Sequence, residues 1–274
     1  MQGLQRTFNY LEASDTALFV YNAGAVSVFG WDGRPRNQHG GLRGGFIAPF
    51  TFRAMHAGPR GLLYGYDTLD MTGGRGHRVQ TWAVRDDGRR RLVAEVPATP
   101  PPMRGTTFQV GTRQARALWA ARSGCVAMSD GGSQWLARVD AGSGRLDTLP
   151  LPRHDVPRYD PAQDARMARR MSGLQDALGG GARISGTLPP TLLARWTEMV
   201  IDPDGYLWIR PWAPAEERDG PVQAFRMSLQ TGQVQPARLP AFPQAFGRAG
   251  EFYTIEKDPD TDEILLVQYR RRAG

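Results

Sequence analysis

The histidines and carboxylates are the first residues in this sequence that could do chemistry. Its four histidines are His39, His56, His77 and His154. None of them shows the H-x-x-x-H or H-E-x-x-H spacing of a metal site, so we interpret each as a loop residue rather than a ligand. The segment DPDTDE begins like a calcium loop, but Glu263 and Tyr269 stand where such a loop needs glycine and a carboxylate. We interpret that segment as a turn between strands.

Nucleotide-binding and nucleophile motifs are missing from the sequence. The single lysine, Lys257, follows Glu256, so no G-K-[ST] phosphate loop exists. No serine lies in a G-x-S-x-G elbow. The one cysteine, Cys125, lies among apolar residues, which favours a buried and inert thiol. The sequence therefore predicts no catalytic residue, no metal ligand and no cofactor.

The net charge of +7 comes from 33 arginines and one lysine. This skew favours a GC-rich genome as its cause, because basic surfaces selected for phosphate binding usually use lysine as well. No apolar run approaches the roughly 18 residues that span a bilayer. The first fifteen residues, MQGLQRTFNYLEASD, lack the basic start and apolar stretch of a signal peptide. As written, the chain is expected in the cytoplasm; a signal ahead of this stretch would instead predict export.

An internal repeat organises the chain. Apolar strands are predicted at 17–22, 61–66, 124–129, 206–211 and 263–269. A second strand follows most of them, at 25–30, 78–84, 134–140 and 221–227. A glycine-containing turn and a further, often basic strand come next. The period-two alternation within each strand predicts sheets with one packed face.

The spacing of the turn glycines gives the length of the repeat. They are Gly33, Gly88, Gly144 and Gly232. The spacing is close to 55 residues except before the last glycine, where about 32 more residues are inserted. Each unit therefore has room for about four strands, which is the size of one propeller blade.

The insertion, residues 153–189, is predicted to contain a helix near 158–180. Asp160, Pro161 and Gln163 form a capping arrangement at its start. Met167, Met171, Leu174 and Leu178 recur at helical spacing, and glycines 179–181 end the pattern. We interpret this stripe as packing against the β-structure rather than as a partner-binding groove.

The order of strand, D-P-D-G turn, L-W-I strand, V-x-x-F strand and D-G-R turn resembles the six-bladed β-propeller superfamily, in particular its NHL-type and related bacterial members. The residues that carry the resemblance are SDTALFVYNAGAVSVFGWDGR (14–34) and VIDPDGYLWIRPW (200–212). It implies an all-β fold with four-stranded antiparallel blades. We place the blades within one domain (1–274) at about 6–43, 45–103, 105–152 and 190–243, with a partial blade at 250–270.

The number of units predicts an incomplete ring. The fifth unit is expected to contain only two strands, at 251–257 and 263–269, and all pairing is expected to be antiparallel. The first unit begins near residue 6, which leaves too few residues to complete the last blade. This shortage predicts a missing N-terminal stretch of about a blade and a half.

Function is less constrained than fold, because propellers host binding proteins, scaffolds and enzymes. Our leading hypothesis is a non-catalytic binding or scaffold propeller, whose small-molecule or protein ligand meets one face of the ring. The residues assigned to that ligand are Arg210, Trp212, Arg195 and Glu198. Arg210 and Trp212 follow the end of a strand and combine a fixed charge with a flat apolar surface.

Two alternatives stay open. The resemblance to lactonase-like propellers implies a metal-assisted hydrolase, whose channel carboxylates here would be Glu12, Glu198 and Glu251, with Glu256 as a further candidate. RNA binding stands third and would use arginine for phosphate and indole for bases. We weigh nucleic acid as the weaker alternative, because arginine is spread over every repeat and Trp196, Trp208 and Trp212 suit packing between blades.

Overall fold

A computed structural model of the protein shows which of these strands form and how they pair. It describes residues 10–13, 17–22, 25–39, 52–58, 61–70, 76–85, 89–97, 103–104, 107–109, 115–155, 161–162, 165–166, 169, 183–185, 193–213, 221–247, 251–258, 260–261 and 263–270. The chain divides into two compact units. The first comprises Met1–Pro97, Trp119–Met128 and Ala137–Thr148, and the second comprises Ala98–Leu118, Ser129–Leu136 and Leu149–Gly274.

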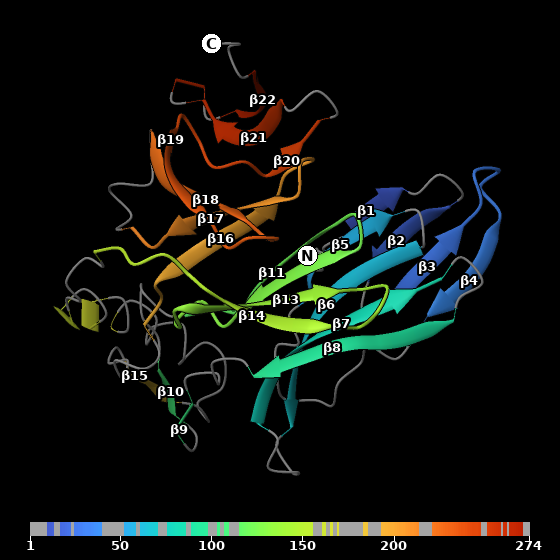
Figure 1. Ribbon diagram of the computed structural model, residues 1–274, viewed down its shortest axis with the longest axis horizontal. Helices are drawn as coiled ribbons and strands as arrows, with labels where there is room; N and C mark the ends of the chain where they lie inside the picture. The colour runs from blue at the N-terminus through green and yellow to red at the C-terminus, as the bar shows by residue number, and fades with distance from the viewer. Residues whose placement is uncertain are drawn as a thin grey trace, which may run out of the picture. The chain divides into compact units, whose positions relative to one another are not determined.

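Four sheets have the strand order of propeller blades, with four consecutive antiparallel strands each (Figure 1). The first contains β1 (Tyr10–Ala13), β2 (Leu18–Asn22), β3 (Ala25–Phe29) and β4 (Pro35–His39). The second contains β5 (Phe52–Gly58), β6 (Gly61–Asp70), β7 (Gly76–Val84) and β8 (Arg90–Pro97). The third contains β11 (Leu118–Arg122), β12 (Cys125–Ser129), β13 (Trp135–Asp140) and β14 (Leu146–Pro150). The fourth contains β16 (Trp196–Ile201), β17 (Tyr206–Pro211), β18 (Val222–Ser228) and β19 (Val234–Leu239).

A fifth blade contains β20 (Ala245–Phe246), β21 (Phe252–Lys257) and β22 (Ile264–Tyr269). The prediction of a two-stranded remnant is therefore wrong, because β20 pairs with β21 through Ala245↔Tyr253 and Phe246↔Phe252. A strand of two residues is too short to produce the alternation from which strands are recognised in a sequence. Over the residues that the structure describes, the protein is thus an all-β propeller of five blades with very little helix.

Glycine turns repeat from blade to blade as the spacing predicts. Gly33, Gly144 and Gly232 have φ angles of 74°, 75° and 73°. This left-handed conformation strains any residue with a Cβ atom, so the same turn occurs at the same place in three blades. The repeat read from the sequence is therefore a repeat of hairpins.

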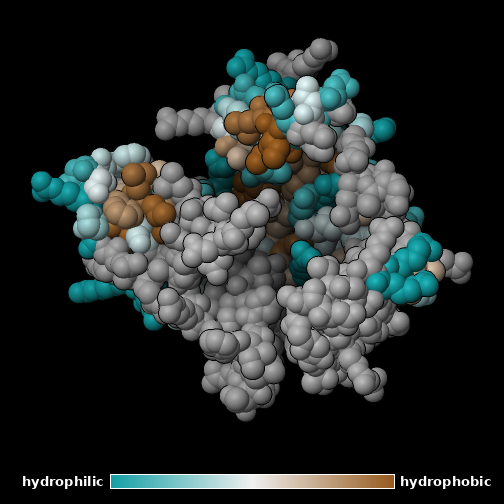
Figure 2. All heavy atoms as spheres, turned by 180° about the vertical axis from the view of Figure 1, so that it is seen from behind, coloured by the Kyte–Doolittle hydropathy of each residue, from teal (hydrophilic) through white to brown (hydrophobic). Residues whose placement is uncertain are grey.

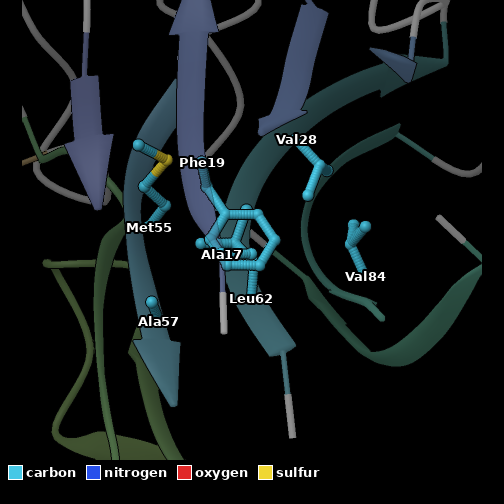
Figure 3. Close-up of a cluster of buried hydrophobic side chains, with 7 residues drawn as sticks. All are labelled: Ala17, Phe19, Val28, Met55, Ala57, Leu62 and Val84. Atoms are coloured by element: carbon cyan, nitrogen blue, oxygen red, sulfur yellow. The ribbon is translucent and has the colours of Figure 1, made fainter. Parts of the chain in front are cut away.

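The core of the first unit lies between the faces of its first two blades (Figure 3). Its buried members are Ala17, Phe19, Val28, Met55, Ala57, Leu62 and Val84. Phe19 and Val28 are fully buried because alternate residues of β2 and β3 point to the same face. Each of the larger side chains contributes about 1.5–3 kcal/mol by leaving water.

The core of the second unit is centred on the fourth blade. Trp196, Leu207, Ile209 and Met227 are almost completely buried. Leu207 and Ile209 share one face of β17, as the alternation in the sequence predicts. The indole nitrogen of Trp196 donates to the carbonyl of Ser133 at 3.1 Å, which satisfies its one polar atom.

Two features lie outside the blades. Residues 161, 162, 165, 166 and 169 are helical, in the region where a helix is predicted, whereas the methionine and leucine stripe and the glycines that follow it lie outside the described residues. A small sheet joins β9 (Met103–Arg104), β10 (Thr107–Gln109) and β15 (Arg183–Ser185). Within the part of the chain that is described, no helix is long and apolar enough to span a membrane.

The small sheet corrects the prediction that all pairing is antiparallel. β10 and β15 pair in parallel, through Thr107↔Arg183, Phe108↔Ile184 and Gln109↔Ser185. A parallel pair needs a long connection, and here the third blade and the insertion lie between the two strands. Short glycine-rich connections require antiparallel pairing within a blade, but they do not constrain segments so far apart in sequence.

Candidate functional site

Three ionisable residues of the first unit come together from the first strands of three blades. Glu12 lies on β1, His56 lies on β5, and Arg122 ends β11. One carboxylate oxygen of Glu12 accepts a hydrogen bond from the backbone nitrogen of Ala57 at 3.4 Å. The charge of Arg122 acts on both Glu12 and His56. We call Glu12, His56 and Arg122 the inner-strand cluster.

Burial sets the protonation of this cluster. Removal from water raises the pKa of Glu12, against the opposing effects of the Ala57 amide and the Arg122 guanidinium. Burial and the charge of Arg122 together lower the pKa of His56 from 6.5 to about 4. At neutral pH the imidazole of His56 is therefore uncharged, with one nitrogen able to donate and the other able to accept.

The chemistry of the cluster suits a ligand that carries both charge and hydroxyl groups. The Arg122 guanidinium can bind a carboxylate or phosphate through two parallel hydrogen bonds. Glu12 accepts from hydroxyl groups, and neutral His56 can do either. Glu12 and His56 could also serve as two ligands of a metal ion, but the described residues contain no group of three or more His, Cys, Asp or Glu side chains that could hold one.

Two members of this cluster, His56 and Arg122, are not among the site residues predicted from the sequence. The interpretation of His56 as a loop residue is wrong, because His56 lies inside β5, with Met55 and Ala57 buried on either side. Those two apolar neighbours, separated by one residue, were the available signal for a strand. His39 and His77 likewise belong to β4 and β7. His154 lies outside the strands, with its ring centroid 4.3 Å from that of Trp196.

We expect the His56 imidazole to titrate near pH 4 when its ring signals are followed by NMR. The unfolded chain takes up this proton near the ordinary value, so protonation favours unfolding as the pH falls from 6.5 towards 4. Each pH unit between these two pKa values lowers the free energy of unfolding by about 1.4 kcal/mol. Below pH 4 the total loss therefore approaches about 3 kcal/mol. Glu12 acts in the opposite sense, because its pKa is raised by folding.

Urea denaturation at pH 7 and pH 4.5 measures this effect. The variant His56→Gln should retain more of its neutral-pH stability at pH 4.5 than the wild-type protein does. An ordinary His56 pKa near 6.5, or the same acid dependence in both proteins, would contradict the burial of this group.

The residues assigned to a ligand from sequence lie in the second unit. Arg210 and Glu198 are cross-strand partners on β17 and β16, and their side chains form an ion pair at 3.0 Å. Trp212 is buried against Ala115 and Ala194, so its indole is not an open flat surface. Its backbone nitrogen donates to the carbonyl of Arg195 at 2.8 Å. The structure thus brings Arg210 to Glu198, and ligand binding by this set stays a prediction.

The D-P-D-G turn of the fourth blade holds a buried charge network. Asp202 accepts hydrogen bonds from the Nε and Nη2 atoms of Arg226 at 3.0 and 2.8 Å and from the indole nitrogen of Trp208 at 3.0 Å. The guanidinium of Arg226 also lies 3.8 Å from the ring centroid of Tyr206. The carboxylate of Asp202, the indole nitrogen of Trp208 and two nitrogens of Arg226 have partners inside the blade, so we assign this network a structural role.

Other candidate groups are also engaged within the protein. Glu256 accepts from the hydroxyls of Thr254 and Tyr269 at 2.7 and 2.8 Å, and the bond from Tyr269 raises the pKa of that phenol. Asp258 accepts from the backbone nitrogens of Asp260 and Thr261 at 2.8 and 3.1 Å, as expected of a turn. Burial raises the pKa of the Cys125 thiol, which keeps it protonated.

Comparison with known proteins gives similarity of structure alone. No family model matches the sequence, and no curated protein matches it. A luciferin-regenerating enzyme is similar over 93% of this chain and 72% of its own, with 15% identity and a TM-score of 0.46. A Bacteroides caccae protein of unknown function is similar over 91% of this chain and 70% of its own, with 10% identity and a TM-score of 0.42.

The Pan2 WD40 domain of Neurospora crassa is similar over 95% of this chain and 60% of its own, with 8% identity and a TM-score of 0.41. The chain thus spans 60% to 72% of the length of these three chains. Similarity at this level carries no activity to this protein. Its assignment as a propeller rests on the strand order of its own blades.

Proposed function

We propose that this protein is a binding propeller, of the NHL-type branch that its sequence resembles, and that it holds a small hydroxylated anion at the inner-strand cluster. One observation carries the proposal: Glu12, His56 and Arg122 lie on the first strands of three different blades, and the carboxylate of Glu12 reaches across to the amide of Ala57, next to His56, at 3.4 Å. Packing alone does not require three ionisable groups to be gathered in this way, because charged groups are costly to bury. The Arg210–Glu198 ion pair is a separate proposed contact point for a ligand.

The protonation of the cluster defines the ligand. A charged guanidinium beside a neutral imidazole favours a ligand with a negative charge, and Arg122 is the group that would bind it. Glu12 disfavours a second negative charge and favours hydroxyl groups, which can donate to it. A hydroxylated carboxylate meets both requirements. A neutral polyol meets only the second.

Isothermal titration with D-gluconate and with sorbitol, which have the same carbon chain with and without a carboxylate, tests this preference. We expect gluconate to bind and sorbitol to bind at least tenfold more weakly, because a hydrogen bond to a charged group contributes about 1.5–3 kcal/mol. Arg122→Gln should weaken gluconate binding by at least tenfold. Arg34→Gln is the matched control, since that side chain is 87% exposed in a turn.

Equal binding of the two compounds, or an equal loss in both variants, would contradict a site at Arg122. No binding of gluconate at millimolar concentration would remove the proposed ligand class.

A hydrolase is the second candidate, and the opposite pKa shifts of Glu12 and His56 favour it. Pairs of groups whose environments move their pKa values in opposite directions are typical of acid–base catalysis. In this version Glu12 would hold or move the proton, and Glu12 and His56 could help to bind a divalent metal. Injecting the corresponding lactone distinguishes the two functions, because turnover releases heat continuously and Glu12→Gln would stop it.

RNA binding remains the third proposal. The indoles of Trp196 and Trp212 are buried. At these two positions RNA binding would therefore depend on the neighbouring arginines, Arg195 and Arg210, alone.

A further inference from the structure

The ends of three hairpins lie together in the first unit. They belong to β3–β4, β7–β8 and β13–β14, and the described residues at these ends are 31–36, 85, 89–92 and 142–146. Val28 and Val84, which lie shortly before the first two ends, are members of one buried cluster. The Nη2 atom of Arg91 donates to the carbonyl of Ala141 at 2.8 Å, which joins the second end to the third. We call the three ends the hairpin surface.

Backbone hydrogen bonds close the first two ends. Gly30 donates its backbone nitrogen to the carbonyl of Arg34, and Arg85 donates to that of Arg89, both at 2.9 Å. Side chains are therefore the main groups that this surface offers to a partner. Figure 1 shows the β3–β4 and β7–β8 hairpins ending on the right of the view, and Figure 2, seen from behind, shows hydrophilic side chains projecting from the left edge.

Every exposed large hydrophobic side chain among the described residues of the first unit lies at the hairpin surface. Trp31 is 61% exposed, and Leu92 and Leu146 are 42% and 45% exposed. Each of the three hairpins contributes one of these residues. Single exposed apolar residues are common on proteins, but their confinement to one surface indicates a site of interaction.

Arginine is the other main component of the hairpin surface. Residues 31–36 and 85–92 contain six arginines and three aspartates, a net charge of +3. At the third end Asp147 accepts a hydrogen bond from Arg145 at 3.1 Å, so this end contributes an apolar side chain rather than charge. The corresponding hairpin of the fourth blade, residues 228–235, has no charged residue. A basic hairpin end is therefore not a general property of these blades.

The combination of charged and apolar groups favours a membrane surface over a nucleic acid. Both partners carry phosphate groups, which arginine binds. A nucleic acid gains from aromatic side chains that stack on its bases, and only Trp31 among the three exposed apolar residues can do so. A bilayer gains from all three, because tryptophan favours the headgroup region and leucine is stabilised at the boundary of the acyl chains.

We propose that the hairpin surface binds the anionic face of a lipid bilayer. Trp31, Leu92 and Leu146 enter the headgroup region, and the arginines of the first two hairpins contact the anionic headgroups. Attraction of this kind is electrostatic in part, so it weakens as salt screens the charges. The inference is independent of the ligand proposed for the inner-strand cluster, because the two sites share no residue.

Flotation of the full chain with lipid vesicles tests the proposal. We expect binding to vesicles of phosphatidylcholine and phosphatidylserine, in a ratio of about 7:3, to be at least tenfold tighter than binding to phosphatidylcholine alone. Binding should fall steeply as NaCl rises from about 50 to about 300 mM. The double variant Arg85→Gln/Arg89→Gln should bind at least fivefold more weakly. Arg166→Gln/Arg169→Gln is its matched control, because it removes the same charge from exposed positions in the second unit.

Leu92→Gln distinguishes a bilayer from a nucleic acid, because leucine cannot stack on a base. This variant should bind the mixed vesicles at least threefold more weakly. Ile255→Gln is the matched control, since Ile255 is 57% exposed in the second unit, and it should bind as the wild-type protein does. Phosphatidylcholine brominated in its acyl chains should quench tryptophan fluorescence when it is included in the mixed vesicles, and Trp31→Leu should remove this quenching.

Equal binding to the two kinds of vesicle would overturn the proposal. Equal losses from the hairpin variants and their matched controls, or quenching that Trp31→Leu retains, would do the same. Tighter binding of a single-stranded oligonucleotide that Leu92→Gln leaves unchanged would assign the hairpin surface to nucleic acid, and would also overturn the proposal.

Discussion

Replacing Asp202 by alanine should lower the free energy of unfolding by about 3–5 kcal/mol, as expected when one partner of a buried ion pair is removed. The side chains of Asp202 and Arg226 are only 5% and 15% exposed. Without Asp202, the guanidinium of Arg226 stays in the blade, and the exposed carboxylate of Asp204 is the ionic partner that remains to it. The indole nitrogen of Trp208 and the backbone nitrogen of Tyr206 also lose an acceptor.

Asp204→Ala is the matched control, because Asp204 lies in the same turn and contacts the same arginine at 3.2 Å, but is 72% exposed. An exposed pair of this kind contributes about 0–1 kcal/mol. Urea denaturation at neutral pH compares the two variants. Similar losses for both would show that burial of Asp202 does not decide the stability of this blade.

Replacing Gly65 by alanine should cost about 3 kcal/mol or more, at or above the usual range for an overfilled core. A methyl group at this position would lie 2.5 Å from the Cγ atom of Trp119 and 2.6 Å from its Cδ1 and Cδ2 atoms. The indole cannot move freely, because it is 6% exposed and donates to the hydroxyl of Thr81 at 2.9 Å. That hydroxyl in turn contacts the sulfur of Met128.

The clash is tested by combining Gly65→Ala with Trp119→Leu. Removal of the indole costs stability by itself, but it also makes room for the new methyl group. The double variant should therefore lose at least about 1 kcal/mol less than the sum of the two single losses, as residues in contact do. Strictly additive losses would mean that the Cβ atom at position 65 does not meet Trp119.

The blades could be predicted from sequence because their signals are local. Leu207 and Ile209 alternate with Tyr206 and Trp208, and Gly205 adopts a φ of 81° at the turn before them. Both the alternation and the turn conformation depend only on residues within one hairpin. β20 has no such signal, because Ala245 and Phe246 are too few residues to alternate. The parallel pairing of β10 and β15 has none either, because the two strands are far apart in the sequence.

The inner-strand cluster could not be predicted because its members are far apart in the sequence. The resemblance to lactonase-like propellers implies Glu12 as a channel carboxylate, but nothing near it in the sequence points to His56 or Arg122. Their proximity arises only when three blades bring their first strands together. For Trp212 the local signal is misleading. A tryptophan just past the end of a strand suggests an exposed flat surface, but packing against Ala115 and Ala194 buries this indole.

Binding at the inner-strand cluster is tested most directly by the NMR signals of the His56 ring during titration with D-gluconate at pH 7. The proposal predicts saturable shifts of the His56 signals, little change with sorbitol, and loss of the effect in Arg122→Gln. The signals of His154, whose ring centroid lies 4.3 Å from that of Trp196, provide an internal reference. Gluconate that binds without shifting the His56 signals, or shifts that persist in Arg122→Gln, would contradict this site.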